Sequence, residues 1–178
     1  MPFAAIHGTP WSLDFIVAIA CQETGEIWSV LRRKDLGEAQ ILALCVGDII
    51  DSPKRSAFPR NKADLLAQRR GDEMFAVARK AFEDMARHIG GYAPYVDRPQ
   101  KFCRGFGLFQ RDLQFFRDDP EYFLQRKYET FEATLGEALK ELDAQRKRIG
   151  YGSRPTLGIM EMAFGGIAYN IGAGNSRK

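Results

Sequence analysis

A mainly α-helical fold with little or no β-sheet is the class that this sequence predicts, and three observations predict it. Apolar residues recur three and four positions apart in several long segments, which is the spacing of one helix face. Strict alternation of apolar and polar residues, typical of half-buried strands, is scarce. The 178 residues are 45% hydrophobic and contain no repeat or linker, so we expect one domain over residues 1–178.

The first half of the chain contains three predicted helices. Ser12 is a suitable N-cap for a helix through Cys21 or beyond, whose apolar residues lie nearly all round, as in a buried helix. An apolar stripe predicts a second helix over 38–50, and two prolines in 51–59 predict a loop after it. Apolar residues at helical spacing predict a third helix over 72–89, which the following glycine pair ends.

The second half contains the longest predicted helix. Asp119 is its candidate N-cap, with Pro120 at the first helical position. Its apolar residues alternate in steps of four and three, and a basic run ends it at Arg148, before Gly150 as the C-cap. A last helix, apolar on most faces, is predicted over 156–171.

Charge and composition argue against several classes of function. The net charge of +3 suits a polyanion, but the basic residues are dispersed and no nucleic-acid-binding motif is present. The three cysteines form no C-x-x-C pair and only two histidines accompany them, so we expect buried thiols and no metal site. The apolar run 15–21 lacks a basic flank and is much shorter than the roughly 20 residues of a membrane span. We therefore expect neither a signal peptide nor a membrane span.

The first motif that carries chemistry is A-I-A-C-Q-E-T-G over residues 18–25. It is expected to place Glu23 at the end of the apolar helix, where the chain turns at Gly25. Desolvation disfavours the charged form of a carboxyl group, so a Glu against an apolar wall has a raised pKa. A general acid needs such a pKa near neutral pH. The alternative is an exposed residue at a helix end without a catalytic role.

The second motif is G-F-G-L-F-Q-R-D over residues 105–112. Small residues let a backbone approach a ligand closely, and the amide of Gln110 is suited to binding a sugar hydroxyl or acetamido group. The alternative is a simple turn before a helix.

The third motif is I-A-Y-N-I-G-A-G-N over residues 167–175. Tyr169 and Asn170 end an apolar helix before a glycine-rich loop. A tyrosine hydroxyl near the acid would orient it or contact the substrate. The alternative is a core tyrosine followed by an asparagine C-cap.

Together and in this order, the three motifs resemble those of the lysozyme-like superfamily of peptidoglycan-cleaving enzymes, above all soluble lytic transglycosylases and goose-type lysozymes. Those families carry E-S-G at the end of a buried helix, then G-L-M-Q, then A-Y-N-x-G. The counterparts here are Glu23–Gly25, Gly107–Gln110 and Ala168–Gly172. The resemblance implies that Glu23 protonates the leaving glycosidic oxygen. It also implies substrate-binding roles for Thr24, Gly107, Phe109, Gln110, Tyr169 and Asn170.

The sequence departs from the pattern of those families in three places. Thr24 replaces Ser and Phe109 replaces Met. Glu23 and Phe106 are 83 positions apart (106 − 23), far more than the families place between their first two motifs. We therefore expect a helical insertion over residues 30–100 of the lysozyme-like catalytic domain, where it lines the groove or carries a different specificity.

The presence or absence of a second catalytic carboxylate distinguishes two mechanisms of glycosidic bond cleavage. A hydrolase of the usual kind uses two, whereas lytic transglycosylases use one Glu as acid and then as base. Goose-type lysozymes have the pattern D-R … G-F-G-L-M-Q-x-D, which resembles Asp97-Arg98 and Asp112 here, with the first Asp displaced. Asp112 and Asp97 are thus candidates for activating water. Alternatively, Asp112 caps a helix and Asp97 pairs with Arg98. Asp48 and Asp51 rank lower.

The expected function is hydrolysis of the β-1,4 bond between N-acetylmuramic acid and N-acetylglucosamine, without a metal or an organic cofactor. Alternatives are a lytic transglycosylase that forms 1,6-anhydro ends and a hydrolase of chitin or chitosan. A non-catalytic glycan-binding module is an alternative of a different class. The expected partner is peptidoglycan or a related amino-sugar polymer, with no nucleic acid. We expect a monomer in an extracytoplasmic location, whether periplasmic, secreted or phage-delivered.

Overall fold

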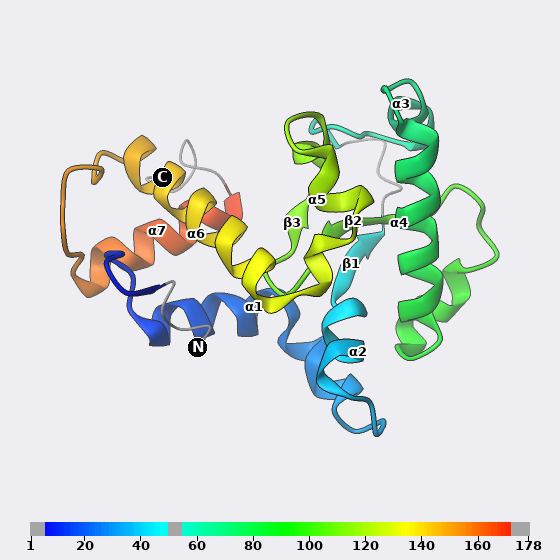
Figure 1. The fold of residues 1–178 in the computed structure, drawn as a ribbon, viewed down its shortest axis with the longest axis horizontal. Coiled ribbons are helices and arrows are strands. Elements are labelled where there is room, and N and C mark those ends of the chain that lie inside the picture. Colours follow the sequence, from blue (N-terminus) through cyan, green and yellow to red (C-terminus); the bar gives the residue numbers. More distant parts are fainter. Residues whose placement is uncertain (1–5, 50–54, 172–178) are drawn as a thin grey trace. The chain divides into compact units, whose positions relative to one another are not determined.

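The computed structural model describes residues 6–49 and 55–171, and it confirms a mainly helical fold with one small sheet (Figure 1). The helices are α1 (Leu13–Leu31), α2 (Glu38–Ala43), α3 (Lys62–Leu66), α4 (Gly71–Ala86), α5 (Pro120–Leu124), α6 (Phe131–Arg148) and α7 (Ile159–Ile171). The strands are β1 (Val46–Ile49), β2 (Cys103–Phe106) and β3 (Arg111–Asp112), and the short 3-10 helices are η2 (Gly90–Tyr95), η3 (Leu113–Arg117) and η4 (Lys127–Glu129). The chain divides into two compact units, one of residues 1–22 and 135–178 and one of residues 23–134.

An antiparallel sheet in the order β1-β2-β3 lies in the unit of residues 23–134. Gly47 on β1 pairs with Gly105 on β2, which in turn pairs with Asp112 on β3. α4 lies alongside the sheet (Figure 1). Their buried side chains form one core, which includes Phe82 of α4 and Phe106 of β2. Because β2 and β3 pair as antiparallel neighbours, residues 105–112 of the second motif form a β-hairpin.

The helix expected over 38–50 is wrong in its second half. α2 ends at Ala43, and residues Val46–Ile49 form β1 instead. Val46 is fully buried opposite Phe106, and β-branched residues such as valine and isoleucine fit a pleated sheet well. Gly47 also weakens a helix, by about 1 kcal/mol relative to alanine. Pairing with β2, distant in the sequence, thus outweighs the local helical pattern.

The long helix expected from Asp119 is interrupted. Asp119 does act as an N-cap, since its side chain accepts the N–H of Tyr122, but α5 ends at Leu124. Arg126 adopts a left-handed conformation, with φ of 54°, and α6 begins only at residue 131. The interruption brings Tyr128 of η4 into the core, fully buried and packed against the Phe106 ring at a centroid distance of 5.0 Å. Burial of two aromatic rings offsets the loss of helical hydrogen bonds.

α1 is longer than the first motif suggests. Ser12 Oγ accepts the N–H of Phe15 at 3.2 Å, as expected of the N-cap. The helix then continues through Gly25 to Leu31, so the expectation that Glu23 ends it is wrong. Ile27 and Leu31 are buried one turn apart, and their packing offsets the roughly 1 kcal/mol that a glycine costs inside a helix.

The helix expected over 72–89 is confirmed as α4, although it ends at Ala86 and the glycine pair expected to end it begins η2 instead. Gly71 sets the start of α4. Ala78, Phe82 and Met85 of its apolar stripe are buried, as the spacing predicts. A Cβ atom at position 71 would lie closer than 3.0 Å to the backbone carbonyl oxygen of Leu65. Glycine is therefore required where α4 follows α3.

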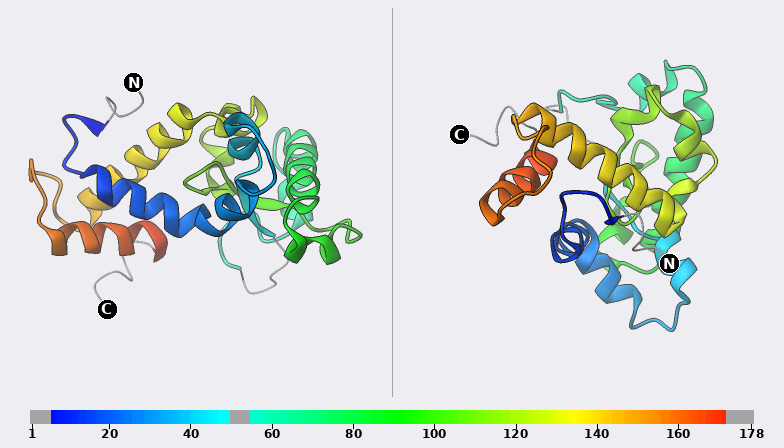
Figure 2. Two further views of the ribbon diagram at one scale, coloured as in Figure 1. Left: turned by 90° about the horizontal axis from the view of Figure 1, so that it is seen from below. Right: turned by 60° about the vertical axis from the view of Figure 1, so that its left-hand side comes forward.

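The other unit contains the first half of α1 and most of α6 together with α7. The first half of α1 lies beside α7 in both views of Figure 2. Trp11 stacks on Phe15 at a centroid distance of 5.0 Å, and a Cβ at Gly165 of α7 would lie closer than 3.0 Å to the Trp11 ring. The last helix, expected from residue 156, begins at Ile159 and is otherwise confirmed.

The expectation of buried thiols is correct for two of the three cysteines. Cys45 and Cys103 are buried, whereas Cys21 is exposed on α1. Burial raises the pKa of the Cys45 thiol to about 12 and also raises that of Cys103. Across residues 6–49 and 55–171, no helix combines the length and the apolar character that crossing a membrane requires.

The close approach at Gly71 leads to a stability prediction. Gly71→Ala should lower the free energy of unfolding by about 1–3 kcal/mol, because the methyl group meets backbone rather than a movable side chain. Gly90→Ala is the control, since a Cβ there meets no atom within 4 Å. Urea unfolding of both variants measures the difference. Equal stability of the two variants would contradict the role given to Gly71.

Candidate active site

One buried hydrogen bond docks the second half of α1 onto the turn between β2 and β3. Thr24 Oγ1 donates to the carbonyl oxygen of Leu108 at 2.9 Å, and Thr24 is only 2% exposed. Leu108 also packs against an apolar cluster of Ile27, Leu31, Ile41 and Cys45. The bond joins the first motif to the second and fixes the neighbouring Glu23 relative to the sheet. Thr24 thus has a structural role that its expected substrate contact did not include.

The Glu23 carboxyl group is half-buried, and its pKa is raised from 4.5 to about 7. Burial is the larger cause, because removal of water disfavours the charged carboxylate. The second cause is the negative charge of Asp48. A carboxyl group with this pKa keeps its proton in about half of the molecules at neutral pH. The shift has the direction that the first motif predicts, although Glu23 lies within α1 rather than at its end.

Asp48 on β1 is the acidic neighbour that the sequence ranked low. It has a φ of 52°, a left-handed conformation that aspartate tolerates better than most residues. Its side chain is 64% exposed, and one of its oxygens accepts hydrogen bonds from Arg104 Nε at 3.0 Å and Nη2 at 2.7 Å. Asp48 is therefore a solvent-accessible carboxylate that is paired with Arg104 and acts electrostatically on Glu23.

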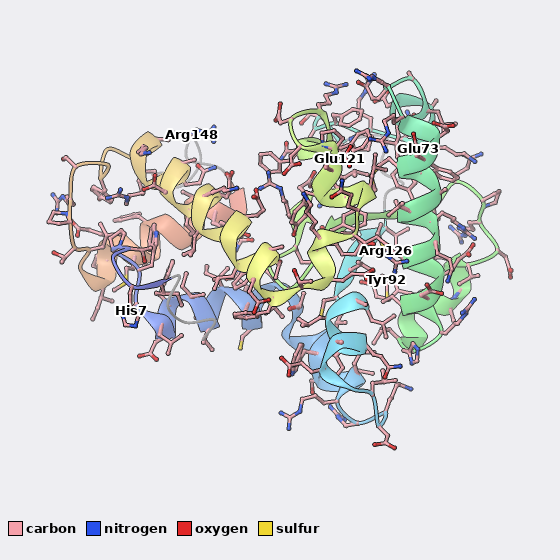
Figure 3. The ribbon with its side chains drawn as sticks, viewed as in Figure 1. His7, Glu73, Tyr92, Glu121, Arg126 and Arg148 are labelled. Carbon is pink, nitrogen blue, oxygen red and sulfur yellow. The ribbon has the colours of Figure 1, made fainter. Side chains whose placement is uncertain are left out.

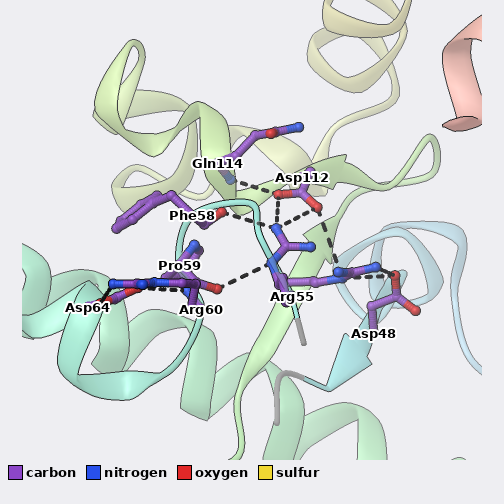
Figure 4. Close-up of polar contacts among 9 residues, drawn as sticks. Asp48, Arg55, Phe58, Pro59, Arg60, Asp64, Asp112 and Gln114 are labelled. Carbon is purple, nitrogen blue, oxygen red and sulfur yellow. Dashed lines mark hydrogen bonds and ion pairs between the residues drawn. The ribbon is translucent and has the colours of Figure 1, made fainter. Parts of the chain in front are cut away.

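A chain of ion pairs continues from Asp48 to Asp112 (Figure 4). Arg104 Nε lies 4.0 Å from Asp112 Oδ2, and Arg55 Nη2 lies 2.7 and 3.1 Å from the two oxygens of Asp112. Arg55 is 9% exposed and also donates to the carbonyl oxygens of Phe58 and Pro59. The carboxylate of Asp112 thus links β3 to the proline-containing loop.

Asp112 also has the capping role that was its alternative interpretation. Its Oδ1 accepts the N–H of Gln114 at 2.8 Å at the start of η3. The cap and the ion pair with Arg55 both occupy the carboxylate. These contacts explain Asp112 without a role in activating water.

Gln110 covers the pair of glycines at the centre of the sheet. Its Nε2 donates to the carbonyl oxygens of Cys45 at 3.2 Å and Gly107 at 2.9 Å. A Cβ at either Gly47 or Gly105 would lie closer than 3.0 Å to Gln110 Oε1. The small residues of the second motif therefore make room for Gln110 itself. The amide nitrogen serves the fold, which leaves only Oε1 for the expected contact with a sugar.

Gly107 and Phe109 are occupied by packing. Gly107 has a φ of 79°, and a Cβ there would lie closer than 3.0 Å to Thr134 Oγ1. The Phe109 side chain is 2% exposed, so it packs inside the protein rather than facing a ligand. The close backbone approach expected of this motif is thus made to the chain's own residues.

The remaining predicted site residues lie elsewhere in the chain. Asp97 is exposed just after η2. Tyr169 is half-buried and Asn170 is exposed, and both belong to α7 in the unit of residues 1–22 and 135–178. The glycine-rich end of the third motif, residues 172–175, lies outside the described residues.

Two arginines belong to the site although the sequence analysis did not single them out. Arg104 directly precedes the second motif, and Arg55 lies in the loop between the prolines. Their positions beside acidic residues become visible only once β1 pairs with β2. Among residues 6–49 and 55–171, no group of three or more His, Cys, Asp or Glu side chains is placed to hold a metal ion.

Comparisons with protein-family models, with curated proteins and with solved structures found no match to this chain. The function of the chain is therefore inferred from its motifs and from the geometry around Glu23.

The raised pKa of Glu23 makes the stability of the protein depend on pH. Between pH 4.5 and about 7 the folded protein holds a proton that the unfolded chain has released, so stability falls as pH rises through this window. Glu23→Gln removes the ionisation. The variant should match the wild-type protein near pH 4 and should have the higher melting temperature near pH 8. Thermal unfolding at both pH values measures this effect, and an unchanged difference in melting temperature would contradict the shifted pKa.

Proposed function

We propose that this protein cleaves the β-1,4 bond between N-acetylmuramic acid and N-acetylglucosamine in peptidoglycan, with Glu23 as the general acid. The observation that carries the proposal is the half-buried Glu23 carboxyl group, with a pKa of about 7, next to a charged aspartate. A carboxyl group that keeps its proton near neutral pH beside a second carboxylate is an arrangement that glycosidases use. The proton of Glu23 passes to the glycosidic oxygen as the bond to C1 of the sugar breaks.

Asp48 is our candidate for the second carboxylate. Breaking the C1–O bond leaves positive charge on the sugar ring, which a nearby carboxylate stabilises. Arg104 binds the Asp48 carboxylate through two hydrogen bonds, and the exposure of Asp48 lets water reach it. In a hydrolase, Asp48 takes a proton from the water that attacks C1. Asp112 was ranked higher from the sequence, but Arg55 and the N–H of Gln114 occupy its oxygens.

The choice of substrate is supported by the ordered motifs rather than by the geometry. The E-T-G, G-L-F-Q and A-Y-N-I-G segments resemble those of peptidoglycan-cleaving families. The net charge of +3 favours association with an anionic wall polymer. A substrate of this kind places the protein's site of action outside the cytoplasm.

A lytic transglycosylase is the second candidate, and the ion pairs of the site favour it. Asp48 and Asp112 are each bound to an arginine, whereas Glu23 makes no ion pair in the described part of the chain. A single carboxyl group that acts first as acid and then as base fits this pattern. The substrate's own hydroxyl would then attack C1 and form a 1,6-anhydro ring in place of hydrolysis.

Replacement of the acid tests the activity itself. Glu23→Gln should lower the rate of release of soluble fragments from purified peptidoglycan by about 10²–10⁴-fold, the usual contribution of a general acid. Glu26→Gln is the matched control, since Glu26 is exposed three positions further along α1. Its rate should equal that of the wild-type protein. Cleavage retained by folded Glu23→Gln would contradict the assignment of Glu23 and leave a glycan-binding module as the better interpretation.

Replacement of Asp48 tests the second carboxylate. Asp48→Asn should shift the alkaline limb of the pH–rate profile to lower pH, because one cause of the raised pKa of Glu23 is removed. Asp35→Asn is the control, since Asp35 is exposed and its left-handed φ of 54° suits asparagine. An unshifted limb would contradict the coupling.

Mass spectrometry of the products separates the two chemistries. In a hydrolase that uses Asp48, Asp48→Asn also lowers the maximal rate, and the ends of the fragments contain an added water. In a transglycosylase, the variant keeps its maximal rate and the ends lack that water.

A further inference from the structure

A pocket of about 520 Å³ lies in the unit of residues 23–134, and none of its lining residues belongs to the site around Glu23 and Asp48. It is lined by residues 68–70, just before α4, and by Phe116, Arg117, Pro120 and Glu121. Glu73 of α4 and Glu121 of α5 are labelled in this part of the molecule in Figure 3. Volumes of this size are typical of small-molecule binding sites and exceed what a single ion requires.

Arg70 forms a fixed wall of the pocket. Its Nε and Nη2 each lie 2.9 Å from an oxygen of Glu73, and its Nη1 lies 2.5 Å from Glu121 Oε1. The other oxygen of Glu121 accepts a hydrogen bond from Gln125 at 2.7 Å. Glu121 is the only carboxylate that lines the pocket within the described residues, and it shares the charge of Arg70 with Glu73.

Arg69 and Arg117 supply the uncompensated positive charge. Both are exposed, and neither takes part in an ion pair among residues 6–49 and 55–171. Arg117 lies over the Phe58 ring at 3.8 Å, an arrangement that holds a guanidinium group in place while its edge stays available for hydrogen bonds. Arg117 also acts electrostatically on Asp64, but the oxygens of Asp64 are bound by Arg60 at 2.7 and 3.1 Å.

We propose that this pocket binds an oxyanion group, phosphate or carboxylate, carried by a ligand of about the size of a sugar. Guanidinium groups bind both kinds of group through paired N–H donors. The amide of Gln68 adds a neutral donor and acceptor, while Phe116 and Pro120 supply apolar surface for the rest of the ligand. The inference rests on the pocket alone, so its failure and the failure of the proposed glycosidase activity are distinguishable.

Calorimetric titration at low ionic strength tests the proposal with four probes: inorganic phosphate, glucose 6-phosphate, glucuronate and glucose. Phosphate and at least one of the two sugar anions should bind, and glucose should not. Arg69→Gln should weaken binding about tenfold, and the double variant Arg69→Gln/Arg117→Gln should weaken it further. Arg32→Gln is the matched control, because Arg32 is exposed, lies outside the pocket and carries the same charge.

Each outcome of this experiment decides the proposal. Stronger binding of glucose 6-phosphate supports a phosphorylated ligand, and stronger binding of glucuronate supports a carboxylated one. The absence of binding by phosphate or by both sugar anions would overturn the proposal, as would equal binding of glucose or affinity that the arginine substitutions leave unchanged. If the double variant unfolds, Arg69→Gln alone carries the test, because Arg69 makes no ion pair within the described residues.

Discussion

The hydrogen bond from Thr24 to the carbonyl oxygen of Leu108 is the contact on which the candidate site depends. It joins residues 84 positions apart, and both the helix and the hairpin turn are placed by it. A hydrogen bond of this kind contributes about 0.5–1.5 kcal/mol, so it favours one register of α1 against the sheet. Because Glu23 precedes Thr24 directly, the same bond determines how much water reaches the Glu23 carboxyl group and how near it lies to β1.

The acidic residues around the sheet differ in their surroundings. Asp48 and Asp112 are bound by Arg104 and Arg55. Glu23 is half-buried and faces the negative charge of Asp48, which favours its protonated form. Acid-catalysed bond cleavage requires a group that holds a proton near neutral pH, and the surroundings of Glu23 favour this form. The three aspartate and glutamate side chains come from α1, β1 and β3, so the sheet creates this contrast.

The helices could be predicted from the sequence wherever local signals act alone. The N-caps Ser12 and Asp119 and the apolar stripe of α4 are examples, because capping and periodicity are properties of neighbouring residues. β1 could not be predicted, since its stability comes from pairing with residues 103–106. The interruption after α5 could not be predicted either, because it depends on the burial of Tyr128 against Phe106.

The candidate site, too, could be predicted from the sequence only in part. The apolar run before Glu23 predicts the direction of its pKa shift, whereas the charge of Asp48 and the bond from Thr24 to Leu108 come from contacts distant in the sequence. Asp48 ranks low in the sequence and Arg104 is not singled out there, because the two become neighbours only through the sheet. Phe109, Gly107 and Gln110 were interpreted as ligand contacts, whereas buried packing and hydrogen bonds to the backbone explain much of their pattern. A motif of small and polar residues is compatible with a tight hairpin as well as with a sugar-binding site.

The central claim is that the folded chain holds a proton on Glu23 near neutral pH, and a site-specific titration tests it most directly. The chemical shift of the Glu23 carboxyl carbon can be followed by NMR from acid to alkaline pH, with its signal assigned by its absence in Glu23→Gln. The structure predicts a midpoint of about 7 for this carbon. A midpoint near 4.5, the ordinary value, would contradict the account of Glu23 as a desolvated acid and with it the proposed catalytic role.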